Sequence, residues 1–141
     1  MSKYFCVRQE EAMDCGLASL STILLYYNKP YSLDYLKKNA GYNDKLGTNF
    51  FHLYSIAINL GFKATALTLR NTKILTDIKL PCIAQLRFST ETMHFVVIYK
   101  VKRNIIIMAD PAKGFRELSC KTFSKCFTNK VLLIYQKGDM V

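Results

Sequence analysis

The sequence predicts an α+β fold in which helices come first and antiparallel strands follow. Apolar residues recur at helical spacing up to residue 61, and β-branched and aromatic runs dominate from residue 63 onward. The two patterns do not alternate as they do in parallel α/β sheets. No internal repeat, low-complexity tract or Gly/Ser-rich linker interrupts the 141 residues, so we expect a single domain.

Three helices are expected in the first half of the chain. Residues 15–27 carry leucines at helical spacing, and Asp14 is placed as their N-cap. Ser32 is the candidate N-cap of a second helix. A third helix opens at Thr48 and stops at Gly61, because glycine permits the left-handed conformation that often ends a helix.

Five strands are expected after these helices, each rich in β-branched or aromatic residues. They are residues 63–69, 82–88, 94–101, 105–109 and 131–135. A hairpin turn at residues 102–104 makes the third and fourth strands antiparallel neighbours. Short helices are expected at residues 73–78 and 121–127. We therefore expect one domain over residues 1–136, with the polar residues 137–141 beginning a linker.

The chain is basic, with 20 Lys and Arg residues against 10 Asp and Glu residues and a formal net charge of +10. The excess is dispersed, and residues 100–103 are its densest stretch, which argues against a dedicated nucleic-acid binder. A solvated basic face is the simplest interpretation. Attraction to an acidic partner or to an anionic membrane surface stays open.

The start of the chain lacks the apolar segment of a signal peptide, and no apolar run approaches the ~20 residues that span a bilayer. Five cysteines cannot all pair within the chain, and with only two histidines they show no zinc-site spacing. We therefore expect a soluble chain in a reducing cytoplasm, without a bound metal.

Cys15 is a candidate nucleophile because of its place in the first turn of the first helix. Backbone N–H groups and the helix dipole stabilise negative charge there, so a thiolate is favoured. Most free cysteines are small buried hydrophobes, and position alone favours that interpretation. The other four cysteines lack such a setting, and we interpret them as structural.

His94 and Asp110 are expected to lie side by side. His94 begins the third strand, and Asp110 ends the fourth strand just before Pro111. A carboxylate beside an imidazole fixes its tautomer and stabilises the imidazolium, which a Cys–His pair needs. Each residue alone also has an ordinary interpretation, an edge histidine and an Asx-turn carboxylate. Gln9, six residues before Cys15, is either a solvent-facing residue or an oxyanion donor acting with the Cys15 backbone N–H.

Several short motifs run in order from about residue 4 to 136. The first is Gln-Glu-Glu-Ala-Met-Asp-Cys-Gly-Leu-Ala-Ser-Leu at residues 9–20. It is followed by Leu-Gly-Thr-Asn at 46–49, Leu-Gly-Phe at 60–62, His-Phe-Val-Val at 94–97 and Ala-Asp-Pro-Ala-Lys-Gly at 109–114. Together they resemble the C39 peptidases, the papain-like N-terminal domains of bacteriocin-processing ABC transporters.

The resemblance implies a papain-like cysteine protease fold, with N-terminal helices packed on an antiparallel sheet. It implies that Cys15 is the nucleophile, His94 the general base and acid, Asp110 the orienting carboxylate and Gln9 the oxyanion donor. The family cuts precursor peptides, bacteriocins or signalling peptides, after a Gly-Gly pair that ends the leader. The apolar residues of the leader dock as an amphipathic helix on an exposed hydrophobic surface.

The Gly-Gly end of the leader must then enter a narrow slot at the active site. The residues expected to wall this slot flank the nucleophile and the base: Met13, Asp14, Thr92 and Met93.

The resemblance also implies partners. Transporter membrane and nucleotide-binding domains follow this domain in the same polypeptide, which places it on the cytoplasmic side of the bacterial membrane. ATP binds to the separate transporter domain, and the peptidase domain requires no cofactor. Two positions depart from the family pattern: Asn28 stands where a glycine is common, and Asn49 stands where a serine is usual.

Two other functions compete with this prediction. A binding module that docks a leader peptide for export without cutting it predicts a lost cysteine or histidine, and neither is lost here. A nucleic-acid-binding domain rests on the net charge alone.

Overall fold

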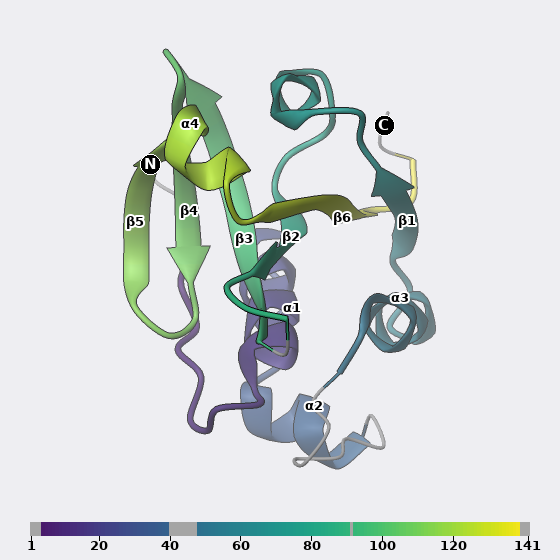
Figure 1. The fold of residues 1–141 in the computed structure, drawn as a ribbon. Coiled ribbons are helices and arrows are strands. Elements are labelled where there is room, and N and C mark those ends of the chain that lie inside the picture. Colours follow the sequence, from purple (N-terminus) through teal and green to yellow (C-terminus); the bar gives the residue numbers. More distant parts are fainter. Residues whose placement is uncertain (1–3, 40–47, 91, 139–141) are drawn as a thin grey trace.

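The computed structural model describes residues 4–39, 48–90 and 92–138 (Figure 1). Its elements in chain order are α1 Cys15–Tyr26, α2 Leu33–Asn39, α3 Phe50–Asn59, β1 Lys63–Thr68, the 3₁₀ helix η1 Thr72–Thr76, β2 Cys82–Arg87, β3 Met93–Lys102, β4 Ile105–Asp110, β5 Gly114–Ser119, α4 Cys120–Ser124 and β6 Phe127–Tyr135. Helices precede strands, so the predicted α+β order is confirmed.

The strands form one antiparallel sheet in the order β1-β6-β2-β3-β4-β5. The predicted hairpin between β3 and β4 is present. Its turn residues Arg103 and Asn104 have φ of 51° and 66°, the left-handed conformation that a two-residue hairpin turn requires. In this register the start of β3, with His94, lies at the same end of the sheet as Asp110, the last residue of β4.

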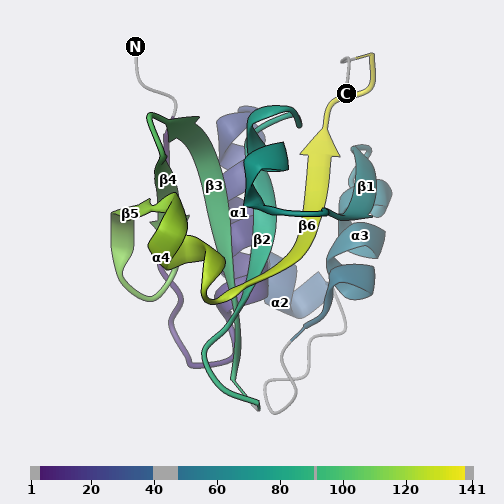
Figure 2. The same cartoon turned by 45° about the horizontal axis from the view of Figure 1, so that its top comes forward.

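The sheet has a hydrophobic core on each face. Phe95 and Val97 of β3 pack with the apolar residues of α1, α2 and α3, whereas Val96 and Ile98 pack with η1 and α4 on the other face. This alternation is the period-two pattern of a strand buried on both sides. Figure 2 shows α1, α2 and α3 behind the sheet and α4 in front of it.

α1 is the central helix of the first core, and all its residues from Cys15 to Leu24 are buried. Gly16 lets it approach its neighbours closely, because a Cβ there would lie 2.5 Å from Thr48 Oγ1 and 3.3 Å from a Phe95 ring carbon. The Asp14 side chain does not cap this helix, contrary to the prediction. Its backbone is already helical, and its carboxylate points back along the chain instead.

The other predicted boundaries were partly right. Ser32 caps α2 by accepting a hydrogen bond from Tyr35 N at 3.1 Å. α3 is capped by Asn49 rather than by Thr48, since the Asn49 side chain accepts from His52 N. Gly61 has φ of +92°, as its predicted helix-stopping place requires.

Four elements differ from the sequence prediction. The segment expected as a short helix at residues 73–78 is the 3₁₀ helix η1, and the one expected at 121–127 ends earlier, as α4. β6 begins at Phe127, four residues earlier than predicted. β5 was not predicted at all.

Two predicted features fall partly outside the described residues. They are the Leu46 and Gly47 positions of the second motif and residues 139–141 of the expected linker. Within the described part of the chain, none of the helices is long and apolar enough to cross a membrane.

Candidate active site

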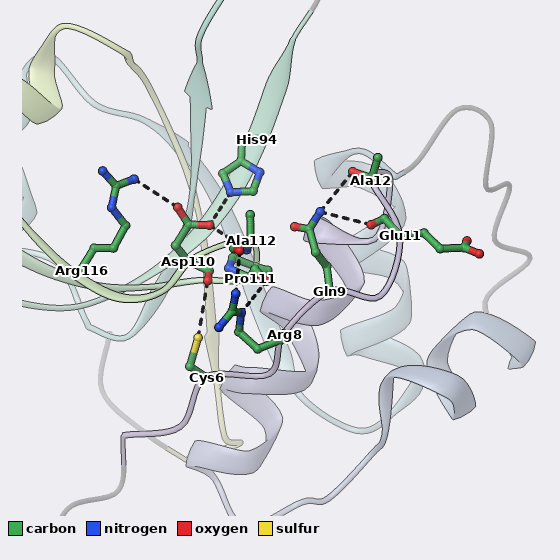
Figure 3. Close-up of polar contacts among 10 residues, drawn as sticks. All are labelled: Cys6, Arg8, Gln9, Glu11, Ala12, His94, Asp110, Pro111, Ala112 and Arg116. Carbon is green, nitrogen blue, oxygen red and sulfur yellow. Dashed lines mark hydrogen bonds and ion pairs between the residues drawn. The ribbon is translucent and has the colours of Figure 1, made fainter.

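His94 and Asp110 lie at neighbouring strand ends and are in contact, as predicted (Figure 3). The His94 Nε2 atom is 2.7 Å from Asp110 Oδ1, and the two side chains are only 11% and 2% exposed. Asp110 Oδ1 also accepts from Ala112 N at 2.8 Å, so the expected Asx turn is present as well. The carboxylate is therefore held by its own turn while it orients the imidazole.

Both groups of this pair have strongly shifted pKa values. Burial lowers the pKa of His94, but hydrogen bonds and charge interactions with Asp110 and Cys15 outweigh it and raise the pKa from 6.5 to about 9. Burial raises the pKa of Asp110, but the contacts with His94, the Ala112 N–H and Arg116 outweigh it and lower the pKa from 3.8 to about 2. At neutral pH the pair is therefore an imidazolium beside a carboxylate.

Cys15 is the first residue of α1 and is 8% exposed. Its side chain interacts with His94, and this interaction is one cause of the raised pKa of that residue. Because Asp110 occupies Nε2, Nδ1 is the ring nitrogen available to the thiol. The first bond of the helix runs from Ala18 N to Asp14 O, so the backbone N–H groups at residues 15–17 have no acceptor within the helix. They stabilise negative charge at the sulfur.

Gln9 lies beside the same loop, because its backbone N donates to Pro111 O at 2.9 Å. Its side-chain Nε2 lies 3.2 Å from Glu11 O and 3.5 Å from Ala12 O, and Figure 3 shows the amide turned toward these carbonyls. Its Oε1 is buried and has no partner among the described residues. The structure therefore places Gln9 beside His94 and Asp110, with an amide that is only weakly held.

Two neighbours of the site were missed by the sequence analysis. Arg116 on β5 lies 3.3 Å from Asp110 Oδ2 and anchors the second carboxylate oxygen. The Phe88 ring lies beside the His94 ring in a tilted arrangement, with the ring centroids 5.9 Å apart. The only sequence signal for Arg116 was the alternation of polar and apolar residues in a short edge segment, and Phe88 gave none.

A groove of about 280 Å³ opens over this site, lined by Gln9, Thr92, Met93, His94 and Asp110 among others. Thr92 and Met93 thus lie where the predicted slot requires them, whereas Met13 is 37% exposed and outside the groove lining.

The prediction that Asp14 walls the slot needs correction, because its side chain is fully buried. It accepts from Glu11 N at 2.8 Å and pairs with Lys37 Nζ at 2.8 Å, and so it holds the loop that carries Gln9.

The arrangement has the parts of a thiol acyl-transfer site: a nucleophile at a helix start, a base in contact with it, and a carboxylate that orients the base. No group of three or more His, Cys, Asp and Glu side chains within residues 4–39, 48–90 and 92–138 is placed to hold a metal ion.

Comparisons with known proteins agree with this geometry. The sequence profile of the Peptidase C39 family matches residues 3–139. The chain is 36% identical over 136 residues to the SPbeta prophage-derived sublancin-168-processing and transport ATP-binding protein SunT of Bacillus subtilis (strain 168). That alignment covers 94% of this chain and 19% of SunT, so the chain spans about a fifth of the length of this curated relative.

Two solved structures are similar over nearly the whole chain. One is the peptidase domain of Streptococcus ComA, a bi-functional ABC transporter involved in a quorum-sensing pathway, with a TM-score of 0.86, 25% identity and coverage of 95% and 99% of the two chains. The other is a double glycine motif protease from an AMS/PCAT transporter in complex with the leader peptide, with a TM-score of 0.86, 29% identity and coverage of 96% and 93%. These likenesses confirm the papain-like α+β fold.

Proposed function

The chain belongs to the Peptidase C39 family, and we propose that it is a cysteine endopeptidase that removes the leader of a precursor peptide by cutting after a Gly-Gly pair. The observation that carries this proposal is the His94–Asp110 pair at the groove, with Cys15 at the start of α1 interacting with His94. The similarity to a double glycine motif protease supports the choice of substrate class.

In the proposed reaction the Cys15 thiolate attacks the carbonyl carbon of the second glycine, and the carbonyl oxygen becomes an oxyanion. The tetrahedral intermediate collapses to a thioester as His94 Nδ1 gives its proton to the leaving amine. A water molecule then attacks the thioester, His94 accepts its proton, and the Cys15 thiolate leaves. Asp110 stabilises the imidazolium without transferring a proton. This cycle needs no metal or organic cofactor.

Gln9 is proposed as the oxyanion donor, together with the backbone N–H of Cys15. Its side chain borders the groove, and its long contacts to the loop carbonyls cost little to rearrange when an oxyanion forms.

The leader is proposed to dock between α2 and α3. A cavity of about 490 Å³ lies there, lined by Tyr35, Leu36 and Ile56 among others. Phe51 and Tyr54 of α3 are also unusually exposed for aromatic residues, at 77% and 38%. Such a surface suits the apolar face of an amphipathic helix.

The relatives are ATP-binding transport proteins of bacteria. We propose on this basis that transporter membrane and nucleotide-binding domains belong to the same polypeptide, with ATP bound by the latter. The peptidase domain then lies on the cytoplasmic side of the membrane, where precursors are made.

The test is cleavage of a synthetic precursor whose leader ends in Gly-Gly, followed by mass spectrometry. Cys15→Ala is expected to abolish cleavage and to keep the far-UV circular dichroism spectrum, because alanine is small and suits a helix. Cys120→Ala is the matched control and should retain most of the activity, since Cys120 is not among the residues that line the groove. Turnover by purified Cys15→Ala would refute the assignment.

A further inference from the structure

A second, strongly basic groove lies beside the catalytic one. It has a volume of about 480 Å³, and we call it the cationic groove for its three basic lining residues, Arg87, Lys125 and Lys130. All three side chains are exposed. In the described part of the chain no Asp or Glu forms an ion pair with any of them. The groove therefore presents three uncompensated positive charges.

The cationic groove is built from regular structure. β2 pairs with the start of β6 at Leu86 and Phe127, and the Arg87 backbone N donates to Cys126 O at 2.7 Å. Thr128 Oγ1 of β6 donates to Gln85 O of β2 at 3.1 Å and so joins the two strands that line the groove. Figure 2 shows the connection from α4 to β6 crossing β2 and β3 near the hairpin that joins those two strands.

Met93 joins the two grooves, because it lines both. It pairs with Arg87 across β2 and β3 and directly precedes His94. The cationic groove thus begins one residue from the catalytic base.

The protonation of the leaving amine fixes which part of the peptide lies beside His94. His94 must reach the leaving amine to protonate it, so the residues after the cut lie on the His94 side of the site. The oxyanion donors, Gln9 and the Cys15 N–H, hold the carbonyl oxygen of the bond that is cut. The first residues of the released peptide therefore pass Met93 on their way out.

We infer that the cationic groove binds acidic side chains within the first few residues after the cut, and so favours precursors that carry Asp or Glu there. This inference rests on the proposed cleavage function and adds a charge preference on the side of the leaving peptide. An extended peptide advances about 3.3 Å per residue, so such side chains come opposite the groove soon after His94.

Charge complementarity selects a peptide over the other anions that a basic groove attracts. Nucleic acid and anionic lipid also offer negative charge, but neither needs a groove continuous with a catalytic base. Both serve as competing outcomes in the experiment.

Binding is measured first, because it does not depend on cleavage. The probes are two fluorescein-labelled peptides that begin with Gly-Gly and differ only in an Asp-Glu-Asp or Asn-Gln-Asn segment placed after the second glycine. Cys15→Ala protein should bind the acidic peptide roughly tenfold more tightly, since three exposed charge pairs act together. The preference should fall to within about twofold in 0.5 M salt, where exposed charges are screened.

The decisive comparison uses two triple variants with the same change of net charge. The first variant removes the charges of the cationic groove, Arg87→Gln/Lys125→Gln/Lys130→Gln, and is expected to lose the preference for the acidic peptide. The second removes three exposed lysines that line neither groove, Lys63→Gln/Lys100→Gln/Lys102→Gln, and should keep that preference. If both variants lose the preference equally, the net charge of the protein causes it. If neither variant loses it, the cationic groove does not bind the acidic side chains. Either result overturns the inference. Groove-dependent binding of a DNA oligonucleotide or of phosphatidylglycerol vesicles, but not of the acidic peptide, would also overturn it.

Cleavage separates this inference from the proposed function. If precursors with acidic and amide segments are cut at equal kcat/KM in a Cys15-dependent reaction, the function stands and the charge preference fails. If neither precursor is cut although the acidic peptide binds through the cationic groove, the proposed function fails and the groove stands.

Discussion

At the scale of single residues, the charge state of His94 decides how the site starts its reaction. Its contacts with Asp110 and Cys15 hold the pKa near 9, well above the ordinary 6.5. The imidazolium is therefore present throughout the neutral range and ready to stabilise a thiolate. Because the folded pKa is raised, this stabilisation of the fold is complete below about pH 6.5 and is lost as the pH rises through about 9.

We predict that the His94 ring protons titrate in NMR spectra with a midpoint near pH 9. In Asp110→Asn the midpoint should fall, because the neutral amide no longer favours the imidazolium while burial continues to oppose it. The sequence has only two histidines, so a His52→Gln variant assigns the spectrum. A midpoint that Asp110→Asn leaves unchanged would mean that the carboxylate does not control the charge of His94.

Gln9 provides a second prediction at this scale. Gln9→Ala should lower kcat by roughly 10²–10³ with a smaller effect on KM, as the loss of one oxyanion donor does. Glu11→Ala, in the same loop, is the control and should keep kcat within a few fold. An effect on KM alone would instead make Gln9 a substrate contact.

These site residues could be predicted because each has a local sequence signal. Cys15 follows a helix start, and His94 and Asp110 stand at two strand ends joined by a short turn. Arg116 had only a weak signal, the alternation of polar and apolar residues in β5, because this short edge strand is fixed in place by its pairing with β4. Asp14 was placed correctly at the helix start, but the partner of its carboxylate, Lys37, lies on another helix. Contacts between distant segments are what the sequence alone could not reveal.

At the scale of elements, the contact between α2 and the loop before α1 holds Gln9 in place. Lys37 of α2 reaches the fully buried Asp14 at 2.8 Å and also pairs with Glu10 at 3.3 Å. The Asp14 hydrogen bond raises the pKa of Lys37, so the lysine stays charged. Asp14 in turn accepts backbone hydrogen bonds from Glu10 and Glu11. One buried carboxylate thus joins a helix, a loop and the start of α1.

We predict that Lys37→Met lowers the free energy of unfolding by about 3 kcal/mol, because it leaves the buried Asp14 carboxylate without its cation. Lys38→Met is the matched control on the same helix. Lys38 pairs with Asp34, and both side chains are about 70% exposed, so its loss should cost less than about 1 kcal/mol. Urea denaturation measures both values. Equal losses for the two lysines would show that the Asp14 contact contributes no more than a surface pair.

The exact boundaries of the elements, like the contacts of the site residues, depend on packing between distant segments that the sequence alone does not reveal. Asn49 and Thr48 are neighbours and both suit an N-cap, and the choice between them depends on how α3 packs. Asn28 has φ of 64°, which explains why a glycine is common at that position and why asparagine, which tolerates this conformation, can replace it. Long apolar strands were predicted well because their composition is distinctive, whereas β5 was not.

At the scale of the whole molecule, two surfaces of different character accompany the active site. The cavity between α2 and α3 is the proposed site of the leader, and the cationic groove shares Met93 with the catalytic groove. A leader helix docked as proposed is bound equally in the ground state and the transition state, so its contacts should mainly set KM. In the proposed complex the Gly-Gly pair sits at the reacting centre, where a small displacement changes kcat.

The last prediction separates these two contributions with three changes in one precursor peptide. Gly→Val at the residue before the cut, or at the next residue upstream, should lower kcat by about 10²-fold, because a Cβ in the groove by Thr92 and Met93 moves the carbonyl away from the sulfur. Leu→Ala in the leader helix should raise KM and leave kcat nearly unchanged. Steady-state kinetics with the three peptides measures both parameters. If the Gly→Val precursor at the cut is processed at the parent kcat, the groove imposes no steric limit, and specificity must come from the leader helix alone.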